Sequence, residues 1–272
     1  MEASRTAVLV CQGRAVAHGR GLDDPTALPL LRAAERGPVE LVRAGTPPNG
    51  WTERMTYESV RATGEVMVPR TLAIDAAVRE RDAPQLVILG AGLDGRAWRL
   101  PAPAVFEVDH PASQQDKRDR CAGLPAVQRW VPVDFARDDL AAALAAAGHD
   151  PAVPTTWVWE GVVPYLRRGE VIGTVHRVDE LSAPGSRLIV NYQARAFTAS
   201  VGRLVLRTLT GPSSPLAHEP NRSVWTPAAM AALLAGHGFR VRRDQDLLTL
   251  AGPAPTQRAS LRNGRVLVAD RV

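Results

Sequence analysis

The sequence predicts an α/β protein with a mostly parallel sheet and a helical segment in front of it. From about residue 85 onward, short apolar runs alternate with stretches of helical periodicity, the pattern of a parallel sheet with crossover helices. A glycine-rich turn follows the first of these runs, and acidic residues end the next three. Residues 1–82 have helical patterns, and we expect them to form a cover that is part of the same domain as the core of residues 83–272.

The expected elements follow from the spacing of apolar and turn residues. Strands are expected at five apolar runs, which are residues 85–90, 104–109, 129–134, 155–161 and 186–192. Two further strands, at 239–251 and 264–272, are expected to pair antiparallel and to complete a sheet of seven. Helices are expected near 113–122, 138–147 and 170–182, and after Thr226 and Pro227. Residues 52–82 predict one or two helices, broken near Pro69 because proline lacks the backbone N–H.

The composition is that of a globular protein, with 45 % hydrophobic and 22 % charged residues. The net charge is +5, but the basic residues are scattered and form no run, so we expect no nucleic-acid partner. The two cysteines, Cys11 and Cys121, are far apart and belong to no C-x-x-C motif, which argues against a metal site or a disulfide framework. Since no apolar stretch is long enough for a secretory signal or a membrane span, we expect a cytoplasmic protein without a membrane partner.

The turn after the first expected strand contains a G-x-G-x-x-G motif formed by Gly90, Gly92 and Gly95. Glycines at this place let the backbone pass close to a bound group, beyond the carboxyl ends of the strands. The motif is used to seat the pyrophosphate of a dinucleotide. The same turn also suits S-adenosylmethionine, so the glycines alone leave an NAD-dependent oxidoreductase and a methyltransferase open.

Asp94, inside the motif, separates these two cofactors. A diphosphate against this loop would face a like charge at short range, whereas S-adenosylmethionine presents an ammonium and a sulfonium. We expect Arg96 and Arg99 not to reverse this preference, because helical spacing should turn at least one of them outward. The alternative is that Asp94 only caps the helix that begins here.

Acidic residues at the ends of three successive expected strands point to a nucleoside site at one edge of the sheet. Asp109 follows the first glycine by about twenty residues, the spacing of an acid that binds ribose hydroxyls. Asp134 is placed to accept from an adenine amino group, and Phe135 can lie against the ring. Glu160 ends the next strand at the mouth of the expected pocket. A lone acid at a strand end is usually solvated, but three in succession on the ligand side favour a binding site.

Five motifs resemble the leucine carboxyl methyltransferase family, a class I group that depends on S-adenosylmethionine. In chain order they are "LGAGLDGRAWRL", "FEVDHPASQQDKR", "VPVDF", "WEGVVPYL" and "LIVNY". The resemblance extends from about Arg70 to the C-terminal strand. It implies a Rossmann-like sheet of seven strands, mostly parallel with an antiparallel last strand, and N-terminal helices over the active site.

The resemblance also implies roles for individual residues. Arg70 matches an arginine that binds the carboxylate of the cofactor, a task that suits a planar guanidinium. Gly90, Ala91 and Gly92 match the turn beside the methionine moiety, and Glu160 matches a glutamate near its amino end. For the nucleoside, it assigns the residues already singled out, Asp109, Asp134 and Phe135.

One departure from the family concerns the N-terminus. The protein-modifying members carry a further basic residue for the cofactor's carboxylate, and the sequence leaves Arg5, Arg14 and Arg20 open for that role. The start of the chain is short and rich in glycine. We therefore expect a small acceptor, a specialised metabolite or a short peptide, in place of a large protein.

The acceptor atom decides whether a base is required. The resemblance favours oxygen, and a carboxylate in particular, which needs no base at neutral pH. The alternative is methylation of carbon or nitrogen in an aromatic heterocycle such as an indole, which must lose a proton. Tyr57, Tyr165 and His218 are the candidate bases, although for any single one of them a buried hydroxyl or a solvated loop histidine is the more common explanation.

Overall fold

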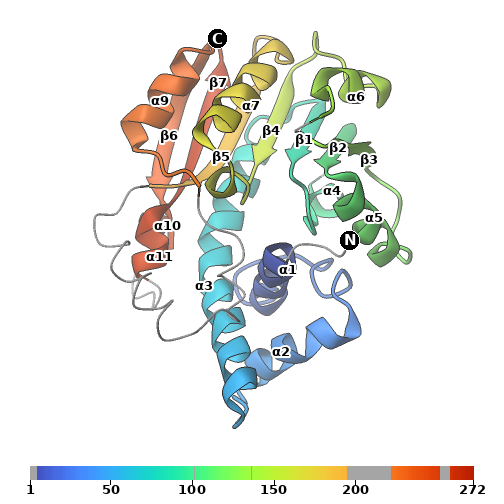
Figure 1. Cartoon of the computed structure of the whole chain (residues 1–272), viewed down its shortest axis with the longest axis vertical. Coiled ribbons are helices and arrows are strands. Elements are labelled where there is room, and N and C mark those ends of the chain that lie inside the picture. Colours follow the sequence, from blue (N-terminus) through green and yellow to red (C-terminus); the bar gives the residue numbers. More distant parts are fainter. Residues whose placement is uncertain (1–4, 101, 136, 195–221, 252–257) are drawn as a thin grey trace.

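The computed structural model describes residues 5–100, 102–135, 137–194, 222–251 and 258–272 (Figure 1). Within them, a sheet of seven strands has the order β3-β2-β1-β4-β5-β7-β6. Its strands are β1 (Gln85–Leu89), β2 (Ala104–Asp109), β3 (Arg129–Pro132), β4 (Thr155–Trp159), β5 (Arg187–Gln193), β6 (Phe239–Asp246) and β7 (Gly264–Arg271). Strands β1 to β5 pair with one another in parallel, and β7 runs antiparallel to β5 and β6. The expected α/β fold, with its antiparallel last strand, is therefore confirmed.

The reversal of strand order fixes where a ligand can bind. β1 pairs with β2 on one side and with β4 on the other. The sheet therefore grows from β1 first toward β2 and β3, and then in the opposite direction toward β4 and β5. In an open α/β sheet, such a reversal creates a crevice beyond the carboxyl ends of the strands. The segments that follow β1, β2 and β4 therefore meet at one edge of the sheet.

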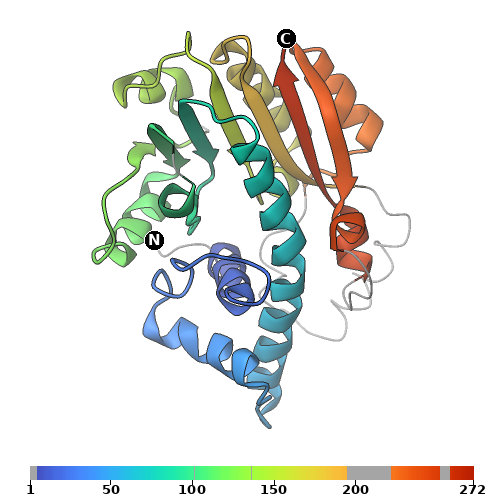
Figure 2. The ribbon, with the colours of Figure 1, turned by 180° about the vertical axis from the view of Figure 1, so that it is seen from behind.

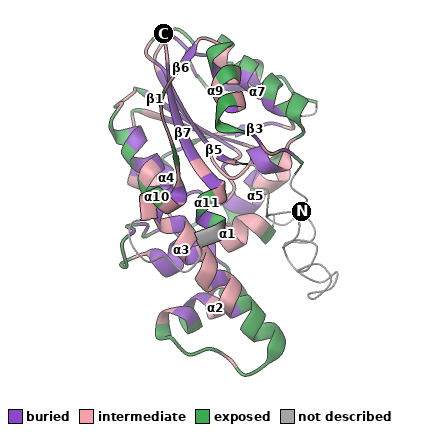
Figure 3. Ribbon diagram, turned by 90° about the vertical axis from the view of Figure 1, so that its left-hand side faces the viewer, coloured by how far each residue is buried: buried purple, intermediate pink, exposed green. Residues whose placement is uncertain are grey.

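Alternate strand residues pack against two helical layers on opposite faces of the sheet (Figures 1 and 2). The helices of the described chain are α1 (Arg5–Ala17), α2 (Ala33–Ala44), α3 (Trp51–Arg79), α4 (Arg96–Arg99), α5 (Pro111–Arg120), α6 (Leu140–Ala146), α7 (Arg168–Glu180), α9 (Pro227–Ala235), α10 (Leu247–Ala251) and α11 (Arg258–Asn263), with the 3₁₀ helix η1 (Val163–Tyr165). Val87 and Leu89 face the layer of α6, α7 and α9. Leu86 and Ile88 face the layer of α3, α4, α10 and α11. Figure 3 shows the sheet buried between them.

Helix α3 runs from the base of the molecule to the sheet without interruption (Figure 2). The predicted break near Pro69 was wrong, since this proline lies inside the helix. A proline in a helix removes one backbone hydrogen bond and crowds the preceding turn. Buried residues on both sides compensate for this, because Val60 packs in the core of the cover and Ile74 packs beneath the sheet.

Helices α1 and α2 pack against the end of α3 that lies away from the sheet (Figure 1). Their buried residues form a third apolar cluster, which includes Cys11, Leu30, Val39 and Val60. Leu93, from the glycine-rich turn after β1, belongs to the same cluster. The N-terminal cover is thus packed directly onto the loop that the sequence assigned to the cofactor.

The remaining differences from the expected elements are local. Strand β3 stops at Pro132, two residues early. The run "LLTLA" forms helix α10 instead of continuing β6, because the Asp246 carboxylate accepts the backbone N–H of Thr249 at 2.9 Å and Leu247 is buried in the core. Among the described helices, none is both long and apolar enough to cross a membrane.

Candidate cofactor site

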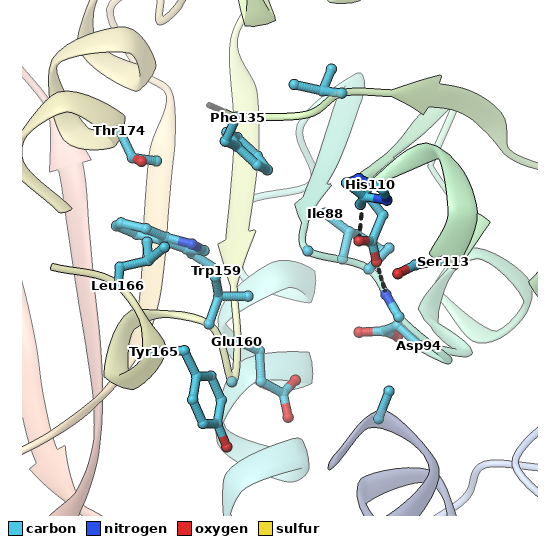
Figure 4. A pocket seen from close by; sticks show the side chains of 18 of the residues that line it. Ile88, Asp94, His110, Ser113, Phe135, Trp159, Glu160, Tyr165, Leu166 and Thr174 are labelled. Atoms are coloured by element: carbon cyan, nitrogen blue, oxygen red, sulfur yellow. Dashed lines mark hydrogen bonds between the residues drawn. The ribbon is translucent and has the colours of Figure 1, made fainter. Parts of the chain in front are cut away.

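A cavity of about 940 Å³ opens at the carboxyl ends of β1, β2 and β4 (Figure 4). It is lined by all of the residues that the sequence predicted for the cofactor, which are Arg70, Gly90, Ala91, Gly92, Asp94, Asp109, Asp134, Phe135 and Glu160. These residues come from α3, from β2 and from the turns after β1, β3 and β4. Helix α1 closes the cavity from the cover side through Ala7, Val10 and Arg14.

The turn after β1 depends on glycine for two reasons. Gly90 and Gly92 have φ angles of +67° and +46°, in the left-handed region that other residues rarely adopt. A Cβ atom on Gly90 would also lie 2.3 Å from Cγ2 of Val162. The backbone N–H groups of Gly90 and Ala91 both donate to the carbonyl of Val108, at 2.8 and 3.1 Å, which ties the turn to β2.

The third glycine of the motif serves the cover. Gly95 has a negative φ of −103°, so its conformation does not require glycine. A Cβ atom there would lie 2.1 Å from Oγ1 of Thr26, which belongs to the segment between α1 and α2. Gly92 is likewise close to the cover, since a Cβ atom on it would lie 3.3 Å from the Cβ of Ala7. The absence of these two side chains lets the cover approach the turn.

The acids on the nucleoside side are held in defined positions. The two carboxylate oxygens of Asp109 accept the backbone N–H groups of Gly92 at 2.6 Å and of His110 at 2.7 Å. Burial raises the pKa of Asp109, against the effect of these two bonds. Each oxygen keeps a lone pair for a further donor. Phe135 is 47 % exposed and its ring faces the cavity beside Asp134, so an aromatic ligand could cover it (Figure 4).

Asp94 and Glu160 are joined by one buried guanidinium. Arg96 Nη1 lies 2.5 Å from Oδ2 of Asp94 and 2.5 Å from Oε2 of Glu160. Arg96 Nε also donates to Oδ1 of Asp75 on α3 at 2.7 Å. Burial alone would raise the pKa of Asp94, but Arg96 and Arg99 hold it well below its ordinary value. Both carboxylates therefore stay ionised at neutral pH.

The expectation that Arg96 or Arg99 turns outward was wrong. Their side chains are 1 % and 6 % exposed, and both contact Asp75. The physical reason is that residues three apart lie on the same face of a helix, and α4 presents that face to α3. The Asp94 carboxylate also accepts the backbone N–H of Arg96 at 2.7 Å, so the capping role left open by the sequence is present as well.

Lys117 of α5 binds the turn after β1 but is not among the residues that line the cavity. Its Nζ donates to the carbonyl of Asp94 at 2.7 Å and to Oε2 of Glu107 at 2.6 Å, and all three groups are buried. Burial raises the pKa of Glu107 to about 7, against the opposing effect of Lys117. This contact links α5, β2 and the turn after β1.

With this geometry in place, comparison with known proteins decides the family. A model of the leucine carboxyl methyltransferase family matches residues 7–179. The chain belongs to this family. Because its members use S-adenosylmethionine, the cofactor and the enzyme class expected from the sequence are confirmed, and the NAD-dependent alternative is dropped.

Individual relatives agree with this family assignment. A proposed S-adenosyl-L-methionine-dependent methyltransferase of Mycobacterium avium is 38 % identical over 205 residues, which cover 69 % of this chain and 66 % of that protein. The chain thus spans slightly less than two thirds of that relative's length. A second one, from Frankia alni, is 32 % identical over 278 residues, which cover 89 % of this chain and 88 % of that protein.

Solved structures share the fold. A DUF574 family protein of Streptomyces avermitilis superposes with a TM-score of 0.59 at 14 % identity, over 99 % of this chain and 98 % of that one. A proposed methyltransferase of Thermobifida fusca gives a TM-score of 0.58 at 14 % identity, over 99 % and 95 %. At these identities the likeness concerns the fold alone.

The cavity of this methyltransferase family member has polar atoms that fit the methionine half of S-adenosylmethionine. Arg70 Nε lies 2.7 Å from Oε1 of Glu160 in an ion pair, yet neither atom makes a hydrogen bond to any described residue. A buried carboxylate oxygen without a donor suits an ammonium, and a guanidinium beside it suits a carboxylate. Burial lowers the pKa of Arg70, while Glu160 opposes that shift.

Among the three N-terminal arginines that the sequence left open, Arg14 reaches the cavity. It is 4 % exposed, its Nε donates to Oδ2 of Asp24 at 2.9 Å, and its Nη2 donates to the carbonyl of Leu93. Arg5 is exposed, and Arg20 donates to a surface carbonyl. A helical spacing with Ala7 and Val10, which also line the cavity, was the signal that could have singled out Arg14.

The structure places two of the three candidate bases, and only one of these two lines the cavity. Tyr165, in η1, lines the cavity, and Figure 4 shows its ring beside Glu160. Tyr57 is 6 % exposed and packs in the apolar cluster of the cover, and it is not among the residues that line the cavity. His218 lies outside the described residues.

Proposed function

We propose that this chain transfers the methyl group of S-adenosylmethionine to a small acceptor, a specialised metabolite or a short peptide, and that the acceptor atom is oxygen, in particular that of a carboxylate. The observation that carries the proposal is the cavity in which Arg70, Asp109 and Glu160 face one space at the carboxyl edge of the sheet. Family membership supports the transfer of a methyl group. A carboxylate acceptor needs no base, so it does not depend on side chains such as Tyr165 and His110, which both line the cavity.

The cofactor residues are part of this proposal. Asp109 accepts from the ribose hydroxyls, and Asp134 accepts from the adenine amino group while Phe135 covers the ring. Gly90, Ala91 and Gly92 form the turn that lies beside the methionine moiety, and all three line the cavity. Asp94 and Glu160 take the ammonium, and Arg70 and Arg14 take the carboxylate. The support is that all of these residues line the same cavity and that Glu160 Oε1 and Arg70 Nε, which pair at 2.7 Å, make no hydrogen bond to any other described residue.

The mechanism requires alignment more than acid–base chemistry. When bound, S-adenosylmethionine supplies an electrophilic methyl group on its sulfonium. The chain fixes the two ends of the cofactor at β2 and β4, and α1 closes the cavity against water through Ala7 and Val10. Such positioning and exclusion of water account for a large part of the rate enhancement that a reactive methyl donor needs.

The test is incubation of the enzyme with a panel of small metabolites and peptides and with cofactor that carries a labelled methyl group. We expect mass spectrometry to find the label in a small carboxylic acid. Mild alkali should then release it as methanol, because a methyl ester is hydrolysed and an N- or C-methyl group is not. Label that resists alkali would overturn the carboxylate assignment. Fragmentation that places this label on a nitrogen or carbon of an aromatic heterocycle would support the alternative, with Tyr165 as the base, whereas a methyl ether would keep oxygen as the acceptor atom.

A further inference from the structure

The carboxylates proposed for the cofactor's ammonium depend on a residue that does not line the cavity. Arg96 lies behind them, 1 % exposed, and its Nη1 lies 2.5 Å from Asp94 Oδ2 and 2.5 Å from Glu160 Oε2. Its Nε donates to Asp75 on α3. The guanidinium thus joins α3, the turn after β1 and the end of β4.

We propose that Arg96 is a positioning residue for methyl transfer, which sets the separation and direction of the Asp94 and Glu160 carboxylates toward the ammonium of the cofactor. The inference rests on the proposed function, because it requires that these two acids bind that ammonium. Arg96 acts through them and touches neither the cofactor nor the acceptor.

The neighbouring arginines cannot replace this bridge. Arg99 pairs with Asp75 at 3.0 Å but lies 3.8 Å from Asp94 and makes no ion pair with Glu160 among the described contacts. Arg70 of α3 pairs with Glu160 at 2.7 Å but makes no ion pair with Asp94 among the described contacts. Without Arg96, two buried carboxylates would face each other across the cavity wall, and such a pair separates or shares a proton.

The charges around the two acids come from every element packed against them. The cations are Arg14 of α1, Arg70 of α3, Arg96 and Arg99 of α4 and Lys117 of α5. The other anions are Asp24, which pairs with Arg14 and Arg99, and Asp75, which pairs with Arg96 and Arg99. Removal of Arg96 therefore leaves cations near each acid but none between the two. The acids should become easier to protonate, and their directions should no longer be fixed.

The experiment compares two ligands that differ only at the amino acid end. S-adenosylhomocysteine carries the ammonium and carboxylate, and 5′-methylthioadenosine lacks both. For Arg96→Gln we expect calorimetric affinity for S-adenosylhomocysteine to fall by about 10- to 100-fold, the loss expected for a charge-assisted hydrogen bond. Affinity for 5′-methylthioadenosine should stay within about threefold of the original, since less than 1 kcal/mol of binding is then affected.

Two control variants separate the outcomes. Arg187→Gln removes a buried arginine that pairs with Asp270 at 2.8 Å, far from the cavity, and should leave the ratio of the two affinities unchanged. Asp109→Asn should weaken both ligands, because both contain the ribose. If Asp109→Asn leaves both affinities intact, the proposed site itself fails, whatever the result for Arg96.

The pH dependence distinguishes positioning from general support of the fold. In Arg96→Gln, affinity for S-adenosylhomocysteine should fall more steeply on acidification than in the original protein, because the pKa values of Asp94 and Glu160 rise when the bridging cation is lost. Arg96→Lys, which keeps the charge but has no second nitrogen for the contact with Asp75, should show the same loss in smaller degree and serves if Arg96→Gln does not fold. Equal weakening of both ligands, or no weakening of either, would overturn the proposal.

Discussion

Thr26 and Gly95 are in direct contact across the boundary between the cover and the core. Oγ1 of Thr26 occupies the place of a Cβ atom at position 95, 2.1 Å from where that atom would lie. The threonine is fixed there, since its hydroxyl donates to Oδ1 of Asp24 at 2.8 Å and Asp24 pairs with Arg14. Gly95, the last glycine of the motif, therefore has no room for a side chain because the cover packs directly against it.

The first prediction follows from this contact. Gly95→Ala should lower the free energy of unfolding by about 1–3 kcal/mol, the usual effect of overpacking a buried contact. Thr26→Ala removes the nearer clashing oxygen but leaves Oδ1 of Asp24, which would lie 2.8 Å from the new Cβ atom, so the double variant should recover only part of the loss that Gly95→Ala causes. Urea unfolding of the four proteins in a double-mutant cycle measures the coupling. Additive effects of the two substitutions would contradict the contact.

Gly90 should behave differently from Gly95. Its φ of +67° penalises any side chain, in addition to the approach of Val162. Gly90→Ala should therefore weaken S-adenosylhomocysteine binding by about tenfold or more, an energy of about 1.4 kcal/mol. Adding Val162→Ala should restore only part of this loss, because the backbone strain remains. Calorimetric titration of the single and double variants tests this, and full recovery would show that only the steric contact matters.

Phenylalanine variants of Tyr165 and Tyr57 test whether the reaction needs a general base, with Tyr57 as the control. Tyr57→Phe should leave kcat/KM unchanged, because Tyr57 packs in the cover and does not line the cavity. Tyr165→Phe should keep kcat within about threefold if the acceptor is a carboxylate, whereas loss of a general base typically lowers the rate by about 100-fold or more. Single-turnover assays with the identified acceptor measure both. A large decrease in kcat for Tyr165→Phe would support the heterocycle alternative.

The lowered pKa of the Glu160 carboxyl should make the stability of the folded protein depend on pH. Burial would raise its pKa, but Arg96 and Arg70 hold it well below the ordinary value of 4.5. A carboxyl group whose pKa is depressed on folding adds stability that is present above its unfolded pKa and is lost as the pH falls through the folded value. Glu160→Gln should therefore lower the free energy of unfolding by about 3 kcal/mol at pH 7, since it breaks a buried ion pair.

The difference in the free energy of unfolding between Glu160→Gln and the original chain should become smaller below pH 4.5. Denaturant unfolding of both proteins at about pH 7, 5 and 3.5 measures it, and these values bracket the ordinary pKa of glutamate. Asp119→Asn, at an exposed position on α5, is the control for a carboxylate without a buried partner. A difference that does not change with pH would show that the Glu160 carboxylate is not stabilised by its arginines.

The parts of the fold that depend on local pattern could be predicted from the sequence. The strands of the sheet follow from short apolar runs, and the parallel arrangement then brings Asp109, Asp134 and Glu160 to one edge without any further information. The glycine turn was recognisable because backbone geometry at Gly90 excludes other residues. These features need no knowledge of how distant segments pack.

The parts of the structure that depend on packing between distant segments could not be predicted from the sequence. The direction of Arg96 is set by Asp75, which lies 21 residues earlier on another helix. Arg14 became a candidate only when α1 was found over the turn after β1, with its guanidinium on the carbonyl of Leu93. Pro69 stays inside α3 because tertiary contacts on both sides outweigh a local preference to break.

Lys117 is the only lysine among the 272 residues, and it is buried beneath the turn after β1 with its ammonium on Glu107. Acylating reagents that target primary amines therefore have a single lysine side chain to modify, and they can reach it only when the packing of α5, β2 and the turn after β1 around it opens. The rate at which such a reagent labels Lys117, with and without bound nucleoside, would measure how often the binding loop opens.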